Sequence, residues 1–274
     1  MYPKITINDV TIRPAPYARR FAEAREAGFT GVEIWMDEAR KYAQENGGPA
    51  AVADLLKENN LRLDQVLLLG DAFSDQHLKN RKAYLENAES IFKETQAVGG
   101  DTLALCATFG QADLKESPAL FAELCDLADE YGIRLSLEFI GWAEIIKDLK
   151  TAWEIVDKAG RKNGGILYDT FHHFFGGTGM KDLEQVPTEY IFAVHIVDAH
   201  RMDISTLEIS RKHRVFPGEG QIPIPEILSV LRDKDYKGFF SLEIFNELYW
   251  QRPSAELAGE GFDAMSRMIS AAGF

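Results

Sequence analysis

The sequence predicts an α/β protein built as a single (β/α)₈ TIM barrel. Short segments rich in β-branched and aromatic residues alternate with longer segments of helical periodicity along the 274-residue chain. This alternation is typical of a parallel sheet with crossover helices. No linker rich in Pro, Gly or Ser interrupts it. We therefore expect one domain over residues 1–274, with eight strands and eight helices, in which closure of the sheet leaves no exposed edge strand.

The expected strands are short, apolar segments, and some of them alternate in polarity. In the segment RLSLEFIG, Ser136 and Glu138 fall on one face and the leucines on the other. The same period of two places Ala193 with His195 and Ser241 with Glu243. The strands are expected at residues 5–12, 31–35, 63–69, 102–107, 134–141, 165–169, 192–198 and 238–245.

The expected helices are marked by apolar spacing and by capping residues. Tyr17, Phe21 and Ala24 recur at helical spacing in the first, which Gly28 ends. Ser117 and Pro118 are typical of a helix start. The helices are expected at 14–28, 49–59, 77–98, 117–132, 148–160 and 181–187, and from about 225 and 254. Residues 199–223 contain no expected regular element and are interpreted as a long loop that covers the substrate.

An open, doubly wound sheet is the structural alternative. Such a sheet normally carries a glycine-rich turn after its first strand, where a dinucleotide phosphate binds. Here Arg13, Pro14, Ala15 and Pro16 stand at that place. The closed barrel is therefore favoured.

Composition and charge exclude several classes of protein. Hydrophobic residues make up 46 % of the chain and charged residues 27 %, so a substantial core is expected. The formal net charge of −13 would repel a phosphate backbone, which argues against a nucleic-acid partner. Cys106 and Cys125 lie in apolar runs and are interpreted as core residues of a protein in a reducing compartment. Without a signal peptide or an apolar run of about 18 residues, a cytoplasmic location and no membrane contact are expected.

Four polar residues stand at equivalent places on the last four expected strands. Active sites of such barrels lie at the C-terminal ends of the strands, so these side chains are expected to converge. Three carboxylates in one confined space repel unless a cation neutralises them, and an added imidazole completes a donor set for one divalent Mn, Zn, Co or Mg ion. The alternative is that each is an isolated capping or hydrogen-bonding group. The proposed ligands are Glu138, Asp169, His195 and Glu243.

A second set of polar residues follows these ligands on the expected loops. Glu144 lies six positions after Glu138, and His172 lies three after Asp169. These side chains can hold substrate oxygens or orient the ligands; the alternative for each is a solvated loop residue. Asp198 and Arg201, which follow His195 by three and six positions, belong to the same set.

Three further residues each have two interpretations, one of which places them in the site. Arg214 lies in a tract of basic and polar residues and is taken as a surface arginine, with binding of a substrate oxygen as the alternative. Asn8 and Glu33 point to the mouth of the barrel by position, and both substrate contact and hydrogen bonding in the barrel interior remain open.

Five segments carry a resemblance to a known family. LEFIGWAE, LYDTFHHFFGG, HIVDAHR, RVFPGEGQI and SLEIF resemble the xylose isomerase-like TIM barrels, grouped as sugar phosphate isomerases and epimerases. Within them the chain is most similar to the inosose isomerases, with ketose 3-epimerases as more distant relatives. The resemblance implies metal ligation by the four residues proposed above, and it implies substrate binding by Glu144, His172 and Arg201. It also implies a small sugar or cyclitol substrate, and related barrels often form homo-oligomers.

The chemistry that the resemblance implies is proton transfer beside a carbonyl. The cation would bind the carbonyl oxygen and a neighbouring hydroxyl and stabilise a cis-enediolate. Glu138 and Glu243 would be the catalytic proton carriers, one on each side of the ion. Arg201 and His172 would hold the hydroxyls that gain negative charge.

Other functions stay open. Arg211, Lys212, His213 and Arg214 could admit a substrate with a carboxylate, as in the dehydroshikimate dehydratase relatives. A lyase of the 3-dehydroshikimate or inosose dehydratase type begins with the same deprotonation and then expels a β-hydroxyl. An endonuclease IV-like enzyme would need a three-zinc cluster with more histidines than the six present. A sugar-binding barrel without catalysis is a third alternative.

Overall fold

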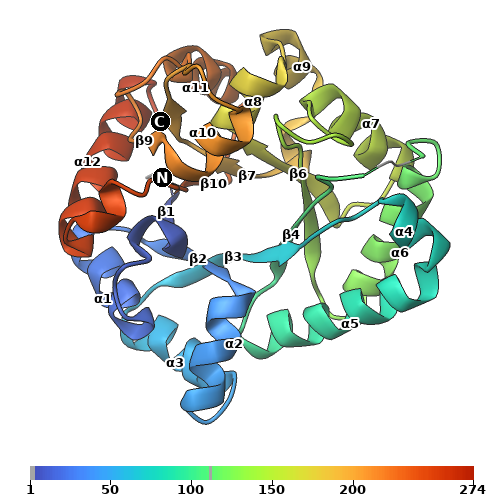
Figure 1. Ribbon diagram of the computed structural model, residues 1–274, viewed down its shortest axis with the longest axis horizontal. Helices are drawn as coiled ribbons and strands as arrows, with labels where there is room; N and C mark the ends of the chain where they lie inside the picture. Colours follow the sequence, from blue (N-terminus) through green and yellow to red (C-terminus); the bar gives the residue numbers. More distant parts are fainter. Residues whose placement is uncertain (1–3, 111–112) are drawn as a thin grey trace.

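The computed structural model describes residues 4–110 and 113–274 and shows a closed barrel (Figure 1). All neighbouring barrel strands are parallel, and β1 closes the barrel against β10. This confirms the predicted single TIM barrel. Around the barrel the strands lie in the order β1, β10, β7, β6, β5, β4, β3 and β2. Their bounds are β1 Lys4–Asn8, β2 Gly31–Trp35, β3 Arg62–Leu69, β4 Thr102–Cys106, β5 Arg134–Glu138, β6 Gly164–Asp169, β7 Ile191–His195 and β10 Phe239–Leu242.

Helices lie around the barrel, and α1, α5, α7 and α12 follow one another around it in chain order (Figure 1). The α-helices are α1 Tyr17–Ala27, α2 Met36–Glu45, α3 Ala50–Glu58, α4 Asp75–Lys79, α5 Arg81–Ala97, α6 Ser117–Asp129, α7 Leu149–Ala159, α8 Thr170–Gly176, α9 Met180–Gln185, α10 Thr206–Lys212, α11 Ile224–Asp233 and α12 Ser254–Ala271. The part of the chain that the structure describes also contains the 3₁₀ helices η1 Asp9–Ile12, η2 Thr188–Tyr190 and η3 Tyr249–Gln251. Among the described residues, no helix combines the length and apolar character needed to cross a bilayer.

The alternation of side chains along each strand divides the core into two parts. Leu103 and Leu105 of β4 belong to the large core between the strands and the helices. Ala104, which lies between them, belongs to a small separate cluster with Leu167 of β6 and Ala193 of β7. Successive residues of a strand point to opposite faces, so this second cluster fills the barrel interior. The interior face is therefore the one that continues upward to the polar residues at the mouth.

The strand register brings the ends of β5, β6, β7 and β10 to one level. Asp169 pairs with His195 across β6 and β7, and Ser241 of β10 pairs with the same histidine. On the other side, Glu138 pairs with Leu167, two residues before Asp169. Parallel strands end at the same edge of a sheet, so these four strands present their last side chains together.

Several expected strand ends are wrong. The segment 5–12 is a strand only to Asn8, because the Asn8 side chain accepts a hydrogen bond from the Val10 N–H and starts η1. The segment 192–198 ends as a strand at His195. Asp198 and Ala199 instead form β8, which pairs antiparallel with β9, Arg214–Val215. The segment 238–245 forms the strand β10 only over Phe239–Leu242, so Glu243 follows the strand directly.

The expected helices also need correction. Helix α2 begins directly after β2, with no loop signal between them, and was not expected. Helix α8 begins at Thr170, because Asp169 caps its first N–H groups. The single helix expected at 77–98 is divided into α4 and α5 at Asn80. The expected loop at 199–223 contains α10, which Ser205 caps by accepting a hydrogen bond from the Glu208 N–H.

Candidate metal centre

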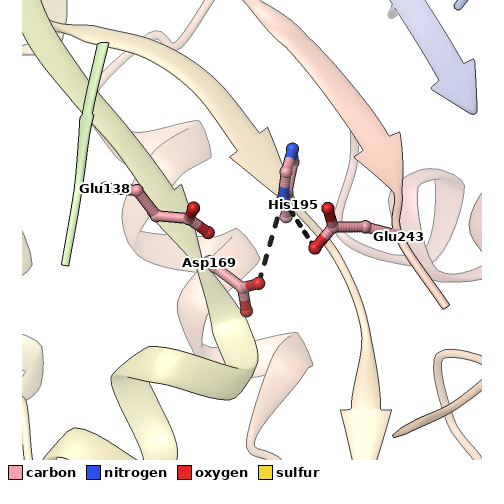
Figure 2. A group of neighbouring side chains, drawn as sticks. All are labelled: Glu138, Asp169, His195 and Glu243. Atoms are coloured by element: carbon pink, nitrogen blue, oxygen red, sulfur yellow. Dashed lines mark ion pairs between the residues drawn. The ribbon is translucent and has the colours of Figure 1, made fainter. Parts of the chain in front are cut away.

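The four proposed ligands converge at the carboxyl ends of the strands (Figure 2). Each offers one ligand atom, and these atoms all lie within 4.8 Å of one another. The side chains are buried, and that of Glu138 is the most exposed at 6 % of its residue surface. Figure 2 shows the carboxylates of Glu138 and Glu243 on opposite sides, with Asp169 and His195 between them.

Local structure explains how each side chain is aimed. Glu138, Asp169 and His195 are the last residues of β5, β6 and β7, and Glu243 follows β10. Asp169 has a second task, because its Oδ1 accepts the N–H groups of Phe171 and of the next residue, at 2.6 and 3.2 Å, and so caps α8. Its Oδ2 is left for the cluster.

His195 presents an unpartnered nitrogen to the carboxylates. Its Nε2 lies 3.0 Å from Glu33 Oε1. Its Nδ1 lies 3.8 Å from Asp169 Oδ2 and 3.6 Å from Glu243 Oε2, and among the described residues it has no hydrogen-bond partner. Burial opposes the charged ring, but the Glu33 and Glu243 carboxylates outweigh it and raise the pKa of His195 well above its usual value. A cation would displace the Nδ1 proton; with Nε2–H still donated to Glu33, the Nδ1 lone pair would then face the ion.

Glu33 holds this histidine from inside the barrel. The Gln65 Nε2 donates to its Oε1 at 3.1 Å, and the Ser241 Oγ donates to its Oε2 at 2.5 Å. Asn8 Nδ2 lies 3.4 Å from Glu33 Oε2 and donates to Glu243 Oε1 at 3.1 Å. Of the two interpretations left open for Asn8 and Glu33, hydrogen bonding in the barrel interior is the one that the structure shows.

The buried carboxylates differ in their proton affinity. Burial and the neighbouring Glu243 carboxylate raise the pKa of Glu138 to about 8. Burial acts in the same direction on Asp169, but Arg214 and His172 outweigh it and lower the pKa of that carboxyl well below its usual value. The pKa of Glu243 is also lowered, because His195 and Arg214 outweigh its burial. A cation among these groups would stabilise the ionised form of Glu138 as well.

Arg214 is the principal correction to the sequence-based site. It is not a surface arginine: only 2 % of it is exposed, and its Nη1 lies 3.0 Å from both Asp169 Oδ2 and Glu243 Oε2. Its burial follows from the pairing of β9 with β8 and from α10, neither of which was expected. The apolar Val215 and Phe216 directly after it were the available sequence signal for a buried segment.

His172 also reaches the cluster. It is buried, its Nδ1 accepts the Gly141 N–H at 3.1 Å, and its Nε2 lies 3.9 Å from Glu138 Oε1 and from Asp169 Oδ2. Burial lowers the pKa of His172 to about 3. A neutral imidazole therefore faces the carboxylates.

The other three predicted substrate-binding residues have their described contacts elsewhere. Glu144 is exposed and accepts the Gly110 N–H at 2.8 Å. Arg201 is exposed, and its guanidinium lies 4.2 Å from the centre of the Phe174 ring. Asp198 is buried and organises the turn that follows β9: its carboxylate accepts backbone N–H groups from Ala199, Gly218, Gly220 and Ile222. Their roles toward a substrate stay predictions.

The residues of the centre fit a divalent cation. Three carboxylates and one imidazole nitrogen form a donor set that Mn, Zn, Co and Mg accept, and the unpartnered Nδ1 of His195 is explained by such an ion. The cavity beside them measures about 40 Å³ and is lined by Glu138, His172, Arg214 and Glu243 together with aromatic side chains. A water molecule needs roughly 10–15 Å³ of such space, so the cavity has room for an ion or a few water molecules.

Comparison with known families agrees with this geometry. The sequence profile of the xylose isomerase-like TIM barrel family matches residues 21–268. The chain belongs to this family. The resemblance drawn from the five sequence segments is thereby confirmed.

Curated relatives in this family carry different activities in their names. A 3-dehydroshikimate dehydratase of Pseudomonas aeruginosa is 30% identical over 246 residues, which are 87% of this chain and 38% of that protein. An inosose isomerase of Halalkalibacterium halodurans is 33% identical over 152 residues, 55% of this chain and 53% of that protein. A D-psicose 3-epimerase of Enterocloster bolteae is 27% identical over 137 residues, 49% of this chain and 41% of that protein. The chain thus spans between about two fifths and one half of the length of these relatives.

A solved structure shows the same fold over nearly the whole chain. The IOLI protein, described with a binding zinc atom, has a TM-score of 0.88 and 22% sequence identity, and covers 98% of this chain and 99% of its own.

Proposed function

We propose that this protein is a divalent-metal-dependent isomerase or epimerase of a sugar or cyclitol ketone. The observation that carries the proposal is the placement of two glutamates, Glu138 and Glu243, on opposite sides of one buried donor set (Figure 2). A reaction that removes a proton from one carbon and returns it on another carbon, or on the other face, needs two such carriers or one that reaches both positions. Relatives named inosose isomerase and D-psicose 3-epimerase support this class of reaction.

The ion would be held by Glu138, Asp169, His195 and Glu243. When bound, it supplies the positive charge that polarises the substrate carbonyl and lowers the pKa of the neighbouring C–H. The IOLI protein, described with a binding zinc atom, supports a bound metal without selecting its identity here.

The chain's own groups would then divide the remaining work. One glutamate carboxylate takes the proton from the carbon beside the carbonyl, and the same or the opposite glutamate returns a proton. The neutral His172, held by the Gly141 N–H, presents Nε2 toward Glu138 and Asp169 and is placed to hold a substrate hydroxyl. Asp169 and His195 keep their positions through the α8 cap and through Glu33.

A lyase is the second candidate, and Arg211 is the observation that favours it. The Arg211 guanidinium lies over the rings of Trp142 and Phe245, at 5.6 and 5.3 Å from their centres, and borders the small cavity. Its side chain is exposed at the mouth, where its charge can pair with a substrate carboxylate. A dehydratase would remove the same kind of proton and release the β-hydroxyl as water. The relative named 3-dehydroshikimate dehydratase supports this candidate.

Proton NMR in D₂O with the metal-loaded protein separates the two candidates. The substrates are a panel of ketoses, inososes and 3-dehydroshikimate. Deuterium entering beside the carbonyl of a ketose or inosose, with a second isomer accumulating, is the result expected of the isomerase. New vinylic or aromatic signals with loss of water from 3-dehydroshikimate or an inosose would establish the lyase instead.

Variants test whether Glu138 acts on the substrate. Glu138→Gln is expected to abolish exchange while ligand binding persists. Glu123→Gln on α6, whose partner Arg81 lies on α5, is a matched control and is expected to exchange like the wild type. Full exchange in Glu138→Gln would contradict its assigned role.

A further inference from the structure

Besides the four ligands, the centre contains a buried arginine, Arg214, whose backbone is part of the fold. The Arg214 backbone N–H donates to the Phe245 carbonyl, and its carbonyl accepts from Asn246 Nδ2 at 2.9 Å. Its partner in the β8–β9 ladder is Ala199. The guanidinium is thus carried on a segment tied both to the end of β10 and to β8, and it reaches the ligands with its side chain almost fully buried.

The guanidinium directs its N–H donors to protein groups. Nε donates to the Ser210 carbonyl at 3.0 Å, and Nη2 lies 3.2 Å from Ser210 Oγ and 3.3 Å from His172 Nε2. Nη1 donates to Asp169 Oδ2 and Glu243 Oε2, each at 3.0 Å. An arginine has five N–H donors, and protein oxygens accept from four of them; His172 Nε2 carries its own proton, because that ring is neutral and its Nδ1 accepts from Gly141. Four of the five donors of Arg214 are therefore held by protein oxygens.

The net charge of the buried carboxylates explains why an arginine lies beside them. The ionised carboxylates of the three ligands and of Glu33 carry four negative charges, and a divalent cation with a neutral His195 offsets only two of them. A net charge buried away from water is costly, so the remaining negative charge requires a partner. Arg214 is the cation in direct contact with two of the three ligand carboxylates.

We infer that Arg214 is a fixed counter-ion of the metal centre, which offsets one of the negative charges that the ion leaves and holds Asp169 and Glu243 in place before the ion enters. The inference rests on the proposed function, because it presumes a divalent ion at the four ligands. It goes beyond that function by giving Arg214 a role toward the metal rather than toward the substrate. A substrate carboxylate, where there is one, falls to Arg211.

If Arg214 is a counter-ion, its removal should change metal affinity in the opposite direction from the removal of a residue that only supports the ligands. A positive charge beside the ligands repels the entering cation, so its removal should strengthen metal binding. The same removal leaves Asp169 and Glu243 facing each other in the metal-free protein and should destabilise it. A residue that only orients the ligands would, when removed, weaken metal binding.

The test compares three variants of the full chain. Arg214→Met removes the charge and keeps the side-chain length, and Arg214→Lys keeps the charge with different geometry. Arg62→Met makes the same chemical change at the amino end of the barrel, where the guanidinium is partly exposed and also pairs with a carboxylate, and is the matched control. Two quantities are measured at fixed pH: the melting temperature of the metal-free protein, and the association constant for Mn²⁺ alone by calorimetry, repeated with Zn²⁺.

For Arg214→Met we expect a metal-free melting temperature lower by roughly 5–10 °C and Mn²⁺ association stronger by roughly tenfold or more. Added Mn²⁺ should raise its melting temperature by more than it raises that of the wild type. Arg214→Lys should bind Mn²⁺ within a few-fold of the wild type. Arg62→Met should change neither quantity appreciably, because its charge is distant from the ligands and is screened by water.

Each other outcome is decisive. A folded Arg214→Met that binds Mn²⁺ no more tightly than the wild type overturns the inference, as does an equal loss of affinity in the Met and Lys variants. If Arg214→Met does not fold alone, the inference requires that Mn²⁺ restores its folding and that Arg214→Lys folds unaided. A wild-type protein that binds neither ion contradicts the proposed function itself, which separates that failure from a failure of the counter-ion role.

Discussion

The two ends of the barrel differ in how far their charged side chains are buried. At the amino ends of the strands lies a cavity of about 620 Å³, lined by charged residues that include Arg62, Asp64 and Arg134. At the carboxyl ends, the cavity beside the four ligands measures only about 40 Å³. The larger cavity contains a partly exposed ion pair of the kind common on protein surfaces. Arg62 is 41% exposed in its side chain and pairs with Asp64 at 3.1 Å.

The difference shows that burial of charge, rather than the size of a cavity, marks the candidate site. At the amino end each charge has water or an opposite charge beside it, so little free energy depends on any one pair. At the carboxyl end, four carboxylates, two histidines and an arginine are buried together. Such a cluster is costly unless its charges are balanced, which makes a bound cation the expected partner.

Removal of one ligand should produce the largest contrast between the ends. Asp169→Ala or His195→Ala is expected to abolish metal binding, because three donors with a disturbed charge balance no longer enclose the ion. Asp64→Ala at the amino end, which loses bonds to Thr6 and Arg62, should keep the full metal content. Elemental analysis after dialysis is the measurement. A full metal complement in either ligand variant would refute the site assignment.

A smaller effect on metal affinity is expected from Glu33, which contacts the ligand His195 from inside the barrel. Glu33→Gln replaces the carboxylate beside His195 Nε2 with a neutral amide, which lowers the basicity of the ring and disturbs its orientation. We expect metal affinity to fall by about 10–100-fold.

The control for this variant is Glu23→Gln on α1, which changes another buried carboxylate, one that pairs with Arg19 at 3.3 Å. Calorimetry with Mn²⁺ should show wild-type affinity there. Equal affinities in the Glu33 variant and the wild type would show that the metal does not depend on this support.

The carboxyl end was predictable from sequence only where strand periodicity determines it. Alternation placed Glu138 and His195 on the interior face, and parallel strand order then brought the ligand positions together. Arg214 was not recognised because its burial depends on β8, β9 and α10, which form through contacts between distant segments. Asp198 is similar, since its carboxylate accepts N–H groups from Gly218 to Ile222, about twenty residues along the chain. Helix α2 was missed because it follows β2 with no turn residue between them.

A pH-dependent effect should also be confined to the carboxyl half. His173 on α8 is buried with its Nδ1 2.7 Å from the Tyr168 hydroxyl, and burial lowers the pKa of His173 to about 4. Its folded pKa is depressed below the unfolded value of about 6.5, so between these values the unfolded chain binds more protons. Stability due to this residue is therefore present above about pH 6.5 and is lost as pH falls toward 4.

Urea unfolding at pH 7 and pH 5 measures this contribution. Between these values the wild type should lose about 2 kcal/mol more stability than His173→Phe, which has no group to protonate there. His172, whose pKa is also lowered by burial, remains in both proteins and cancels in the comparison. Equal losses in the two proteins would show that His173 is not buried as a neutral ring.

The smallest effect belongs to the amino end. Arg62→Ala removes a half-exposed guanidinium that donates to Asp64 at 3.1 Å and lies 3.3 Å from Thr30 Oγ1. Water screens this pair and replaces it when it is lost, so we expect the free energy of unfolding to change by less than about 1 kcal/mol. Metal content and turnover should match the wild type. A large loss of metal affinity in this variant would mean that the two ends are coupled through the barrel interior, since Asp64 also accepts the Thr6 hydroxyl on β1, two residues before Asn8. The contrast between a solvent-exposed amino end and a carboxyl end with buried charges would then be wrong.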